Sequence, residues 1–211
     1  IDQRNHGKSF HSDEMNYEIM ADDLLKIYLD EDIKESILIG HSMGGKTAMA
    51  FAGKNQELLS KLVIVDIAPI KYPRQHDIIL KTLNEIKHQN IKTRSKAKEL
   101  LECKIKDPLL TGFLLKNAEE RDKELKWKIN IDSITKNYTE IADAPKIEKK
   151  IKKKTLFIKG GLSDYLSNIN NKDLDTNFEN AQIEAIEGGT HWVHANKSVE
   201  FMECLKQFIN N

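Results

Sequence analysis

Residues 36–45 constrain this chain most, because an apolar run in them breaks into the pattern Gly-x-Ser-x-Gly centred on Ser42. Residues 36–39 are typical of a buried strand, and residues 46–52 favour a helix. A serine between a strand and a helix is the pattern of a nucleophile elbow, in which glycines let the two elements approach closely. We therefore predict that Ser42 is a nucleophile. The N–H of Met43, at the helix N-terminus, is predicted to bind an oxyanion.

A serine nucleophile needs a base, and His191 is the candidate. It follows a Gly-Gly turn at residues 188–189 and precedes a closing helix predicted from about residue 197 to residue 209. A histidine in such a loop can reach the carboxyl edge of a sheet. His194 competes with it within the same loop. The pair forms a His-x-x-His spacing without a carboxylate or thiol cluster, so no metal site is predicted. Acyl transfer by a serine, a histidine and an acid needs no organic cofactor, so none is predicted either.

Two aspartates that follow apolar strands are candidates for the acid that orients the histidine. Asp66 ends the run at residues 61–65, and the ends of such strands are where open parallel sheets bind ligands. Asp164 follows the next apolar run, residues 155–158, through a Gly-Gly turn. Both fit the chain order Ser, Asp, His. Asp66 is the preferred candidate and Asp164 is the alternative.

Five short motifs are spread over the whole chain. They read Asp2-x-Arg4-Asn5-His6-Gly7-x-Ser9, Gly40-His-Ser42-Met-Gly-Gly45, Val65-Asp66-Ile-Ala-Pro69, Gly160-Gly161-x-Ser163 and His191-Trp-Val-His194-Ala195. Together they resemble the α/β-hydrolases and, within them, the small bacterial YbfF-type esterases. The resemblance implies Ser42 as nucleophile, His191 as base and an acid after the strand that carries Asp66. The position at which most of the wider superfamily carries its acid falls on Ser163.

The start of the chain departs from that pattern. Residues 1–4 resemble the end of the fourth strand of the family, so the resemblance implies that the first strands lie outside this sequence. A loop that gives the second oxyanion N–H would be among the missing parts. Without these parts, strand edges and apolar surface would be exposed. We therefore expect this sequence to be a fragment of a longer protein.

The chain is predicted to have the α/β-hydrolase fold, a mostly parallel sheet flanked by helices, interrupted by a helical lid. The core falls in residues 1–68 and 151–211, and the lid in residues 69–150, where no alternating strand pattern occurs. A lid would keep water away from an acyl-enzyme. Aromatic and apolar residues are possible contacts to substrate: Trp192 in the histidine loop, and Phe113, Leu114, Leu115, Trp127 and Tyr138 in the lid.

Composition limits the partners. The 33 basic and 33 acidic residues cancel, which argues against a nucleic-acid binder or a strongly cationic membrane protein. No apolar run is long enough for a membrane span, so no stable membrane insertion is predicted. Cys103 and Cys204 are isolated, which favours a reducing compartment and, with the resemblance, a cytoplasmic protein. The sequence leaves the oligomeric state open.

The predicted function is hydrolysis of a small-molecule carboxylic ester or thioester, such as an acyl-CoA, through an acyl-enzyme on Ser42. His191 would be the base and Asp66 the orienting acid. Two alternatives stay open. One is a carbon–carbon bond hydrolase or lyase on the same scaffold, and the other is a non-catalytic binding protein or an inactive fragment.

Overall fold

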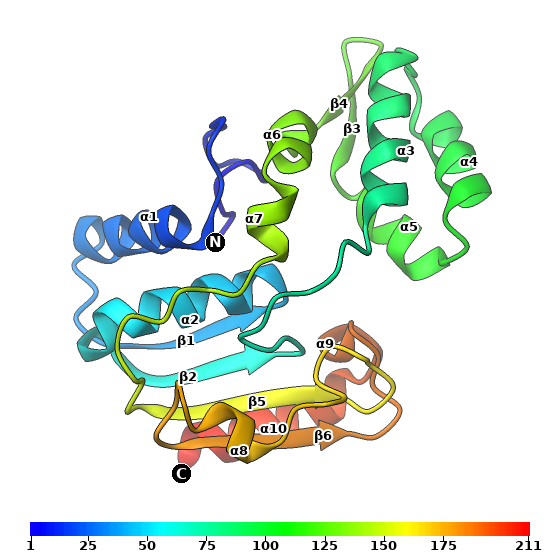
Figure 1. Cartoon of the computed structure of the whole chain (residues 1–211). Coiled ribbons are helices and arrows are strands. Elements are labelled where there is room, and N and C mark those ends of the chain that lie inside the picture. The colour runs from blue at the N-terminus through cyan, green and yellow to red at the C-terminus, as the bar shows by residue number, and fades with distance from the viewer. The chain divides into compact units, whose positions relative to one another are not determined.

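A computed structural model describes all 211 residues and divides them into two compact units (Figure 1). One unit comprises Tyr17–Lys71 and Ala144–Asn211 and is called the α/β unit below. The other comprises Ile1–Asn16 and Tyr72–Asp143 and is called the helical unit. Residues 1–16 thus belong to the same unit as the helices of the middle segment. The role of that segment as a lid stays a prediction.

Four parallel strands form the centre of the α/β unit. They are β1 (Ser36–His41), β2 (Leu59–Val65), β5 (Lys154–Gly160) and β6 (Ala181–Ile186), in the spatial order β1-β2-β5-β6. The central strands β2 and β5 are buried on both faces, which explains why they read as continuous apolar runs rather than as alternating ones. Because all four strands are parallel, their carboxyl ends lie along one edge of the sheet.

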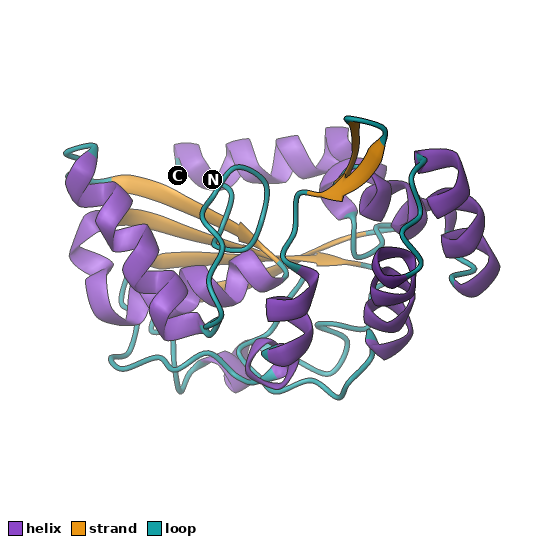
Figure 2. Ribbon diagram, turned by 90° about the horizontal axis from the view of Figure 1, so that it is seen from above, coloured by secondary structure: helices purple, strands orange, loops and turns teal.

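Helices cover both faces of this sheet (Figure 2). On one face lies α2 (Met43–Asn55), with α1 (Tyr17–Asp30) packed against it. On the other face lies α10 (Ser198–Asn210), whose Phe201, Leu205 and Phe208 recur at helical spacing and pack on the sheet. Three short helices complete the unit: η1 (Gln56–Leu58), α8 (Asn171–Leu174) and α9 (Val193–Asn196).

The helical unit has an apolar core of its own. Its helices are α3 (Asp77–His88), α4 (Arg94–Lys104), α5 (Pro108–Leu115), α6 (Ile131–Lys136) and α7 (Tyr138–Ala142). Local sequence sets their ends; for example, Pro108 opens α5 and the Asp107 carboxylate accepts the N–H groups of Leu109 and Leu110. The core is built from side chains of α3, α4, α5 and α6, among them Leu83, Ile86, Leu101, Leu114, Leu115 and Ile131.

The expectation that residues 69–150 contain no strands is wrong. An antiparallel hairpin is formed by β3 (Ala118–Arg121) and β4 (Glu124–Trp127). Its two-residue turn consists of Asp122 and Lys123, with φ of 56° and 62°, as the tight turns of hairpins require. Strands of four residues are too short for alternation to stand out, and this turn lacks the glycine that usually marks such a hairpin.

Residues 1–4 form no strand, although they resemble the end of one. The segment is held in the helical unit by Asn5, which is fully buried. The Asn5 carbonyl accepts the N–H of Asn130 at 2.9 Å, and its side-chain amide donates to Ser133 Oγ at 3.1 Å. In the sheet of the α/β unit, β1 is an edge strand.

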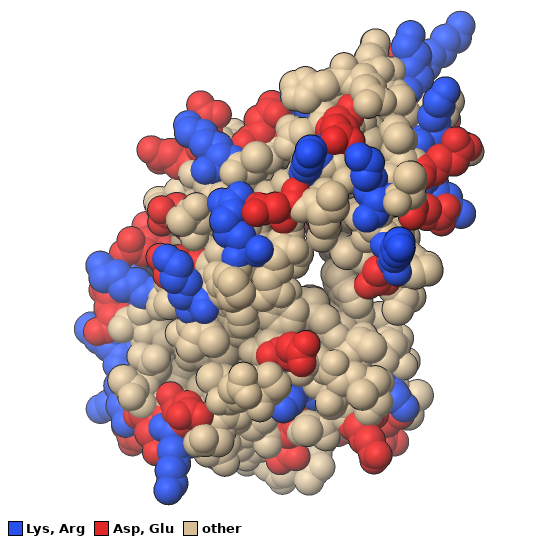
Figure 3. All heavy atoms as spheres, turned by 45° about the vertical axis from the view of Figure 1, so that its right-hand side comes forward, with Lys and Arg blue, Asp and Glu red and all other residues tan.

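Basic and acidic side chains are interspersed on the face shown in Figure 3. Exposed ion pairs of the chain include Lys26 with Asp30 and Arg74 with Asp77. None of the helices has both the length and the apolar character needed to cross a membrane.

Candidate active site

Ser42 occupies a strained turn between β1 and α2. Its φ of 52° and ψ of −122° are rare for a residue with a side chain, and such conformations cost of order 1–3 kcal/mol. The turn is possible because Gly40 has no side chain: a Cβ atom there would lie 2.3 Å from the Gly44 carbonyl oxygen. The Ser42 N–H donates to the Val65 carbonyl at 3.0 Å, which ties the elbow to the end of β2.

Met43 is the first residue of α2, so its N–H has no acceptor within the helix. The Ser42 carbonyl accepts the N–H groups of Gly45 and Lys46 at 2.8 and 3.2 Å, which begins the helix directly behind the serine. The Met43 amide, which follows Ser42 in the chain, therefore lies at the positive end of the helix dipole, where an anion is stabilised.

His191 is carried by the loop between β6 and α9. This loop crosses the end of β5: the Gly161 N–H donates to the Ile186 carbonyl at 2.9 Å, and the Leu162 N–H to the Gly189 carbonyl at 2.7 Å. A Cβ atom on Gly160 would lie only 2.3 Å from the Thr190 carbonyl oxygen. The Gly160-Gly161 pair thus lets the histidine loop approach the sheet.

The three predicted triad residues lie within hydrogen-bond distance in the α/β unit. His191 Nδ1 is 2.8 Å from Asp66 Oδ2, and His191 Nε2 is 3.0 Å from Ser42 Oγ. A carboxylate only accepts, so the proton of the neutral imidazole belongs on Nδ1 and Nε2 is free to accept the serine proton. The Asp66 side chain is fully buried and that of His191 is 20 % exposed.

Asp66 has three donors. Besides His191, the Gly160 N–H donates to Oδ1 at 2.8 Å, and the Ser163 hydroxyl donates to Oδ2. Ser163 is buried, whereas Asp164 is exposed and its backbone carbonyl accepts the Ser167 hydroxyl. No role for Ser163 follows from its residue type alone. Its position after the Gly160-Gly161 turn was the available signal.

Three rings lie close to the His191 imidazole, and a fourth packs against one of the three. Tyr165 stacks on His191 with ring centroids 4.1 Å apart, while His41 and Trp192 lie at 4.7 and 5.6 Å. His194 packs edge-on against His41 at 4.6 Å and is exposed to solvent. Burial lowers the pKa of His41 to about 4, and burial also lowers the pKa of His194.

The remaining predicted substrate contacts lie in the helical unit. Leu114 and Leu115 are buried in its core, and Trp127 packs against that core. The Tyr138 hydroxyl accepts the N–H groups of Gln75 and His76 at 3.2 and 3.1 Å. Phe113 is 43 % exposed. A role of these residues in binding substrate stays a prediction.

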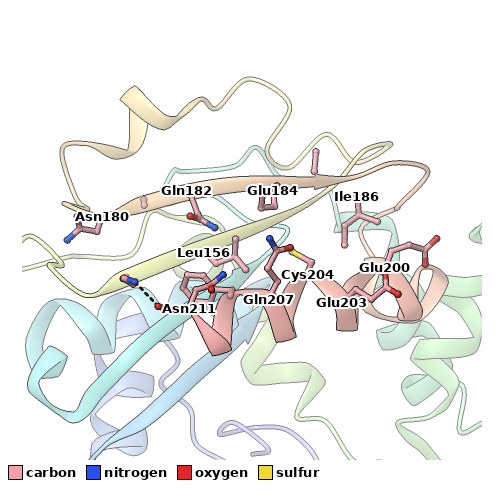
Figure 4. A pocket seen from close by; sticks show the side chains of 14 residues that line it. Leu156, Asn180, Gln182, Glu184, Ile186, Glu200, Glu203, Cys204, Gln207 and Asn211 are labelled. Carbon is pink, nitrogen blue, oxygen red and sulfur yellow. Dashed lines mark hydrogen bonds between the residues drawn. The ribbon is translucent and has the colours of Figure 1, made fainter.

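A hollow of about 860 Å³ lies elsewhere in the α/β unit, between β6 and α10 (Figure 4). Its lining includes Glu184, Glu203, Cys204 and Gln207, and none of the three triad residues. Burial raises the pKa of the Cys204 thiol, which opposes formation of a reactive thiolate.

The fold and the site define an α/β protein with a serine, a histidine and an aspartate aligned at the carboxyl edge of a parallel sheet. The sequence profile of the family with the alpha/beta hydrolase fold matches residues 1–198. The chain belongs to the α/β-hydrolase family, and the predicted fold class is confirmed.

Individual relatives agree with this assignment. The chain is 37 % identical to a putative esterase/lipase of Haemophilus influenzae, covering 100 % of this chain and 72 % of the relative. It is 34 % identical to esterase YbfF of Escherichia coli, covering 100 % and 82 %. Among solved structures, a marine microorganism esterase superimposes with a TM-score of 0.91 at 39 % identity, covering 99 % of this chain and 83 % of that one.

Proposed function

We propose that this protein hydrolyses carboxylic esters or thioesters through an acyl-enzyme on Ser42. The observation that carries the proposal is the continuous hydrogen-bonded line from Ser42 Oγ through the His191 imidazole to the Asp66 carboxylate, with distances of 3.0 and 2.8 Å. The broader class, a carboxylic ester hydrolase, is confirmed by relatives that are named esterases. The roles of the individual residues are our proposal.

In the first half-reaction, Ser42 Oγ attacks the carbonyl carbon of the substrate as His191 Nε2 takes its proton. The Met43 N–H donates to the oxyanion of the tetrahedral intermediate. Protonated His191 then gives its proton to the leaving alcohol or thiol, and the acyl group stays on Ser42. In the second half-reaction His191 takes a proton from water as the water oxygen attacks the acyl carbon; the bond from that carbon to Ser42 Oγ then breaks, the proton on His191 passes to Ser42 Oγ, and the carboxylic acid leaves.

Asp66 makes this cycle possible through the tautomer of His191. Its Oδ2 accepts the Nδ1 proton, so Nε2 faces Ser42 without a proton. When His191 becomes positively charged, the buried carboxylate stabilises the imidazolium. The Gly160 N–H and the Ser163 hydroxyl are two further donors to Asp66, which keep the carboxylate in one orientation.

Active-site labelling tests the proposal directly. The protein is treated with a fluorophosphonate, and the modified peptide is mapped by mass spectrometry. We expect one modified residue, Ser42, and no labelling of Ser42→Ala or His191→Ala. Ser167→Ala is the matched control, because the Ser167 hydroxyl is exposed and bonds only to the Asp164 carbonyl. Labelling that persists in His191→Ala at the original rate would contradict a His191-activated serine.

A substrate panel tests the reaction type. Hydrolysis of p-nitrophenyl esters or acyl-CoA thioesters, lost in Ser42→Ala, is the expected result. Turnover of vinylogous diketones without turnover of any ester or thioester would instead assign the protein to carbon–carbon bond hydrolysis. Comparison of esters with thioesters of equal acyl length identifies the preferred leaving group.

A further inference from the structure

His41 contacts the loop that carries the proposed base, although it belongs to β1, the strand that leads to the nucleophile. It is the last residue of β1 and directly precedes Ser42. Its Nε2 lies 2.8 Å from the backbone carbonyl oxygen of His191. A carbonyl oxygen only accepts, so His41 Nε2 carries the proton and donates it.

The donor is rigidly placed. His41 is paired with Val65 in the parallel ladder between β1 and β2, and the next residue, Ser42, donates its N–H to the same Val65. The His41 ring also packs against the rings of His191, Trp192 and His194. The acceptor, in contrast, belongs to a connection between β6 and α9, and such connections move more than strands do.

One residue thus has backbone continuity with the nucleophile and a side-chain hydrogen bond to the base. Through this hydrogen bond, the end of β1 that positions Ser42 also contacts the main chain of His191. The ring of His41 is neutral near pH 7, because burial lowers its pKa to about 4. It therefore places no second positive charge beside His191 when that residue takes the serine proton.

We propose that His41 is a positioning residue, which holds the His191 backbone through its Nε2–H so that the His191 imidazole stays aligned with Ser42. This inference rests on the proposed function, in which His191 is the base. A base displaced by about 1 Å loses on the order of a hundredfold in rate, so a single hydrogen bond that fixes the loop has a measurable effect.

Two substitutions separate the hydrogen bond from the ring. His41→Phe keeps an aromatic ring against His191 but has no donor, whereas His41→Gln loses the ring but carries an N–H donor at similar reach. For a short-chain p-nitrophenyl ester, we expect His41→Phe to lower kcat about tenfold or more with KM changed less than about twofold. His41→Gln should retain kcat within about threefold of the original protein, because its amide restores the bond.

The two variants also have distinguishable failures. Equal kcat in His41→Phe and the original protein would overturn the inference, as would a larger loss in His41→Gln than in His41→Phe, which would assign the effect to ring packing. Thermal unfolding by circular dichroism establishes that each variant is folded. If a fluorophosphonate does not label Ser42 in the original protein, the proposed function itself is wrong. If Ser42 is labelled and His41→Phe keeps the original kcat, only the role of His41 is wrong.

A measurement without substitution keeps the inference testable if His41→Phe does not fold. Nuclear magnetic resonance of the protein with isotope-labelled histidine reports which ring nitrogen carries the proton. We expect His41 to be neutral with its proton on Nε2 from pH 6 to pH 8, as donation to the His191 carbonyl requires. A proton on Nδ1 would exclude that donation and overturn the inference.

Discussion

The carboxylate of Asp66 lies 2.8 Å from Nδ1 of His191, although 125 positions separate the two residues in the chain. Asp66 follows β2 and His191 follows β6, and β5 lies between these two strands. Neighbouring strands are about 4.8 Å apart, so the histidine loop must fold back across the end of β5. The short contact between Asp66 and His191 therefore depends on close packing over Gly160.

Substitution of Asp66 tests its role as the orienting acid. Asp66→Asn keeps the size of the side chain, but its amide can donate a hydrogen bond to Nδ1 of His191. The imidazole can then carry its proton on Nε2, where it cannot accept the proton of Ser42. We expect kcat to fall by about 10³ to 10⁴, with KM nearly unchanged, in steady-state ester hydrolysis. Asp164→Asn is the control and should retain full activity, because Asp164 is exposed. A large loss in Asp164→Asn alone would assign the acid to the alternative aspartate.

Removal of the Ser163 hydroxyl should reduce both stability and turnover. Ser163→Ala leaves the buried Asp66 carboxylate without one of its three donors. We expect the free energy of unfolding in urea to fall by about 1–3 kcal/mol, together with a decrease in kcat. Ser167→Ala, at an exposed site four residues on, should change neither quantity by a measurable amount. Unchanged urea midpoints for both variants would show that the hydroxyl of Ser163 is dispensable.

A methyl group at Gly160 should damage the site, whereas the same group at Gly112 should not. A Cβ on Gly160 meets the Thr190 carbonyl oxygen at 2.3 Å, so the histidine loop must move, while nothing lies within 4 Å of a Cβ on Gly112. We expect Gly160→Ala to lower kcat at least about tenfold through misplacement of His191. Gly112→Ala, inside α5, should raise stability by about 0.5–1 kcal/mol without changing kcat. Normal turnover by Gly160→Ala would contradict the close approach.

Acid should destabilise the folded protein partly through His41. Its pKa is about 4 in the folded protein, against 6.5 for an unperturbed histidine. Between these values the unfolded chain binds a proton that the folded protein does not bind, so the free energy of unfolding falls as the pH falls from 6.5 to 4. The contribution is at most about 3 kcal/mol and is fully present above pH 6.5.

Denaturant unfolding at several pH values checks this expectation. The loss of stability between pH 6.5 and pH 4 should be smaller in His41→Gln than in the original protein, whatever the absolute stability of the variant. The lowered pKa of His6 acts in the same direction in both proteins. Equal slopes against pH would show that His41 does not resist protonation in the folded state.

Local pattern was sufficient for much of the α/β unit. A buried parallel strand reads as a continuous apolar run, and a strand that breaks into Gly-x-Ser-x-Gly before a helix has few alternatives, so β1, Ser42 and α2 were predictable. The hairpin at Ala118–Arg121 and Glu124–Trp127 was not, because strands of only four residues, three of them charged in the first strand and two in the second, give no clear periodic signal. The placement of residues 1–16 in the helical unit depends on Asn5, a polar side chain that composition would leave on the surface.

For the site, residue types and their order along the chain were enough to predict which residues could perform acyl-transfer chemistry. They left Asp66 and Asp164 both open as the acid, because each follows an apolar strand and chain order does not report distance. The folded structure was needed to show that Asp66 rather than Asp164 lies beside His191, that Ser163 donates to that carboxylate, and that His41 Nε2 lies within hydrogen-bond distance of the His191 carbonyl. These contacts join segments more than 90 residues apart, and packing of the parallel strands, rather than local preference, brings such segments together.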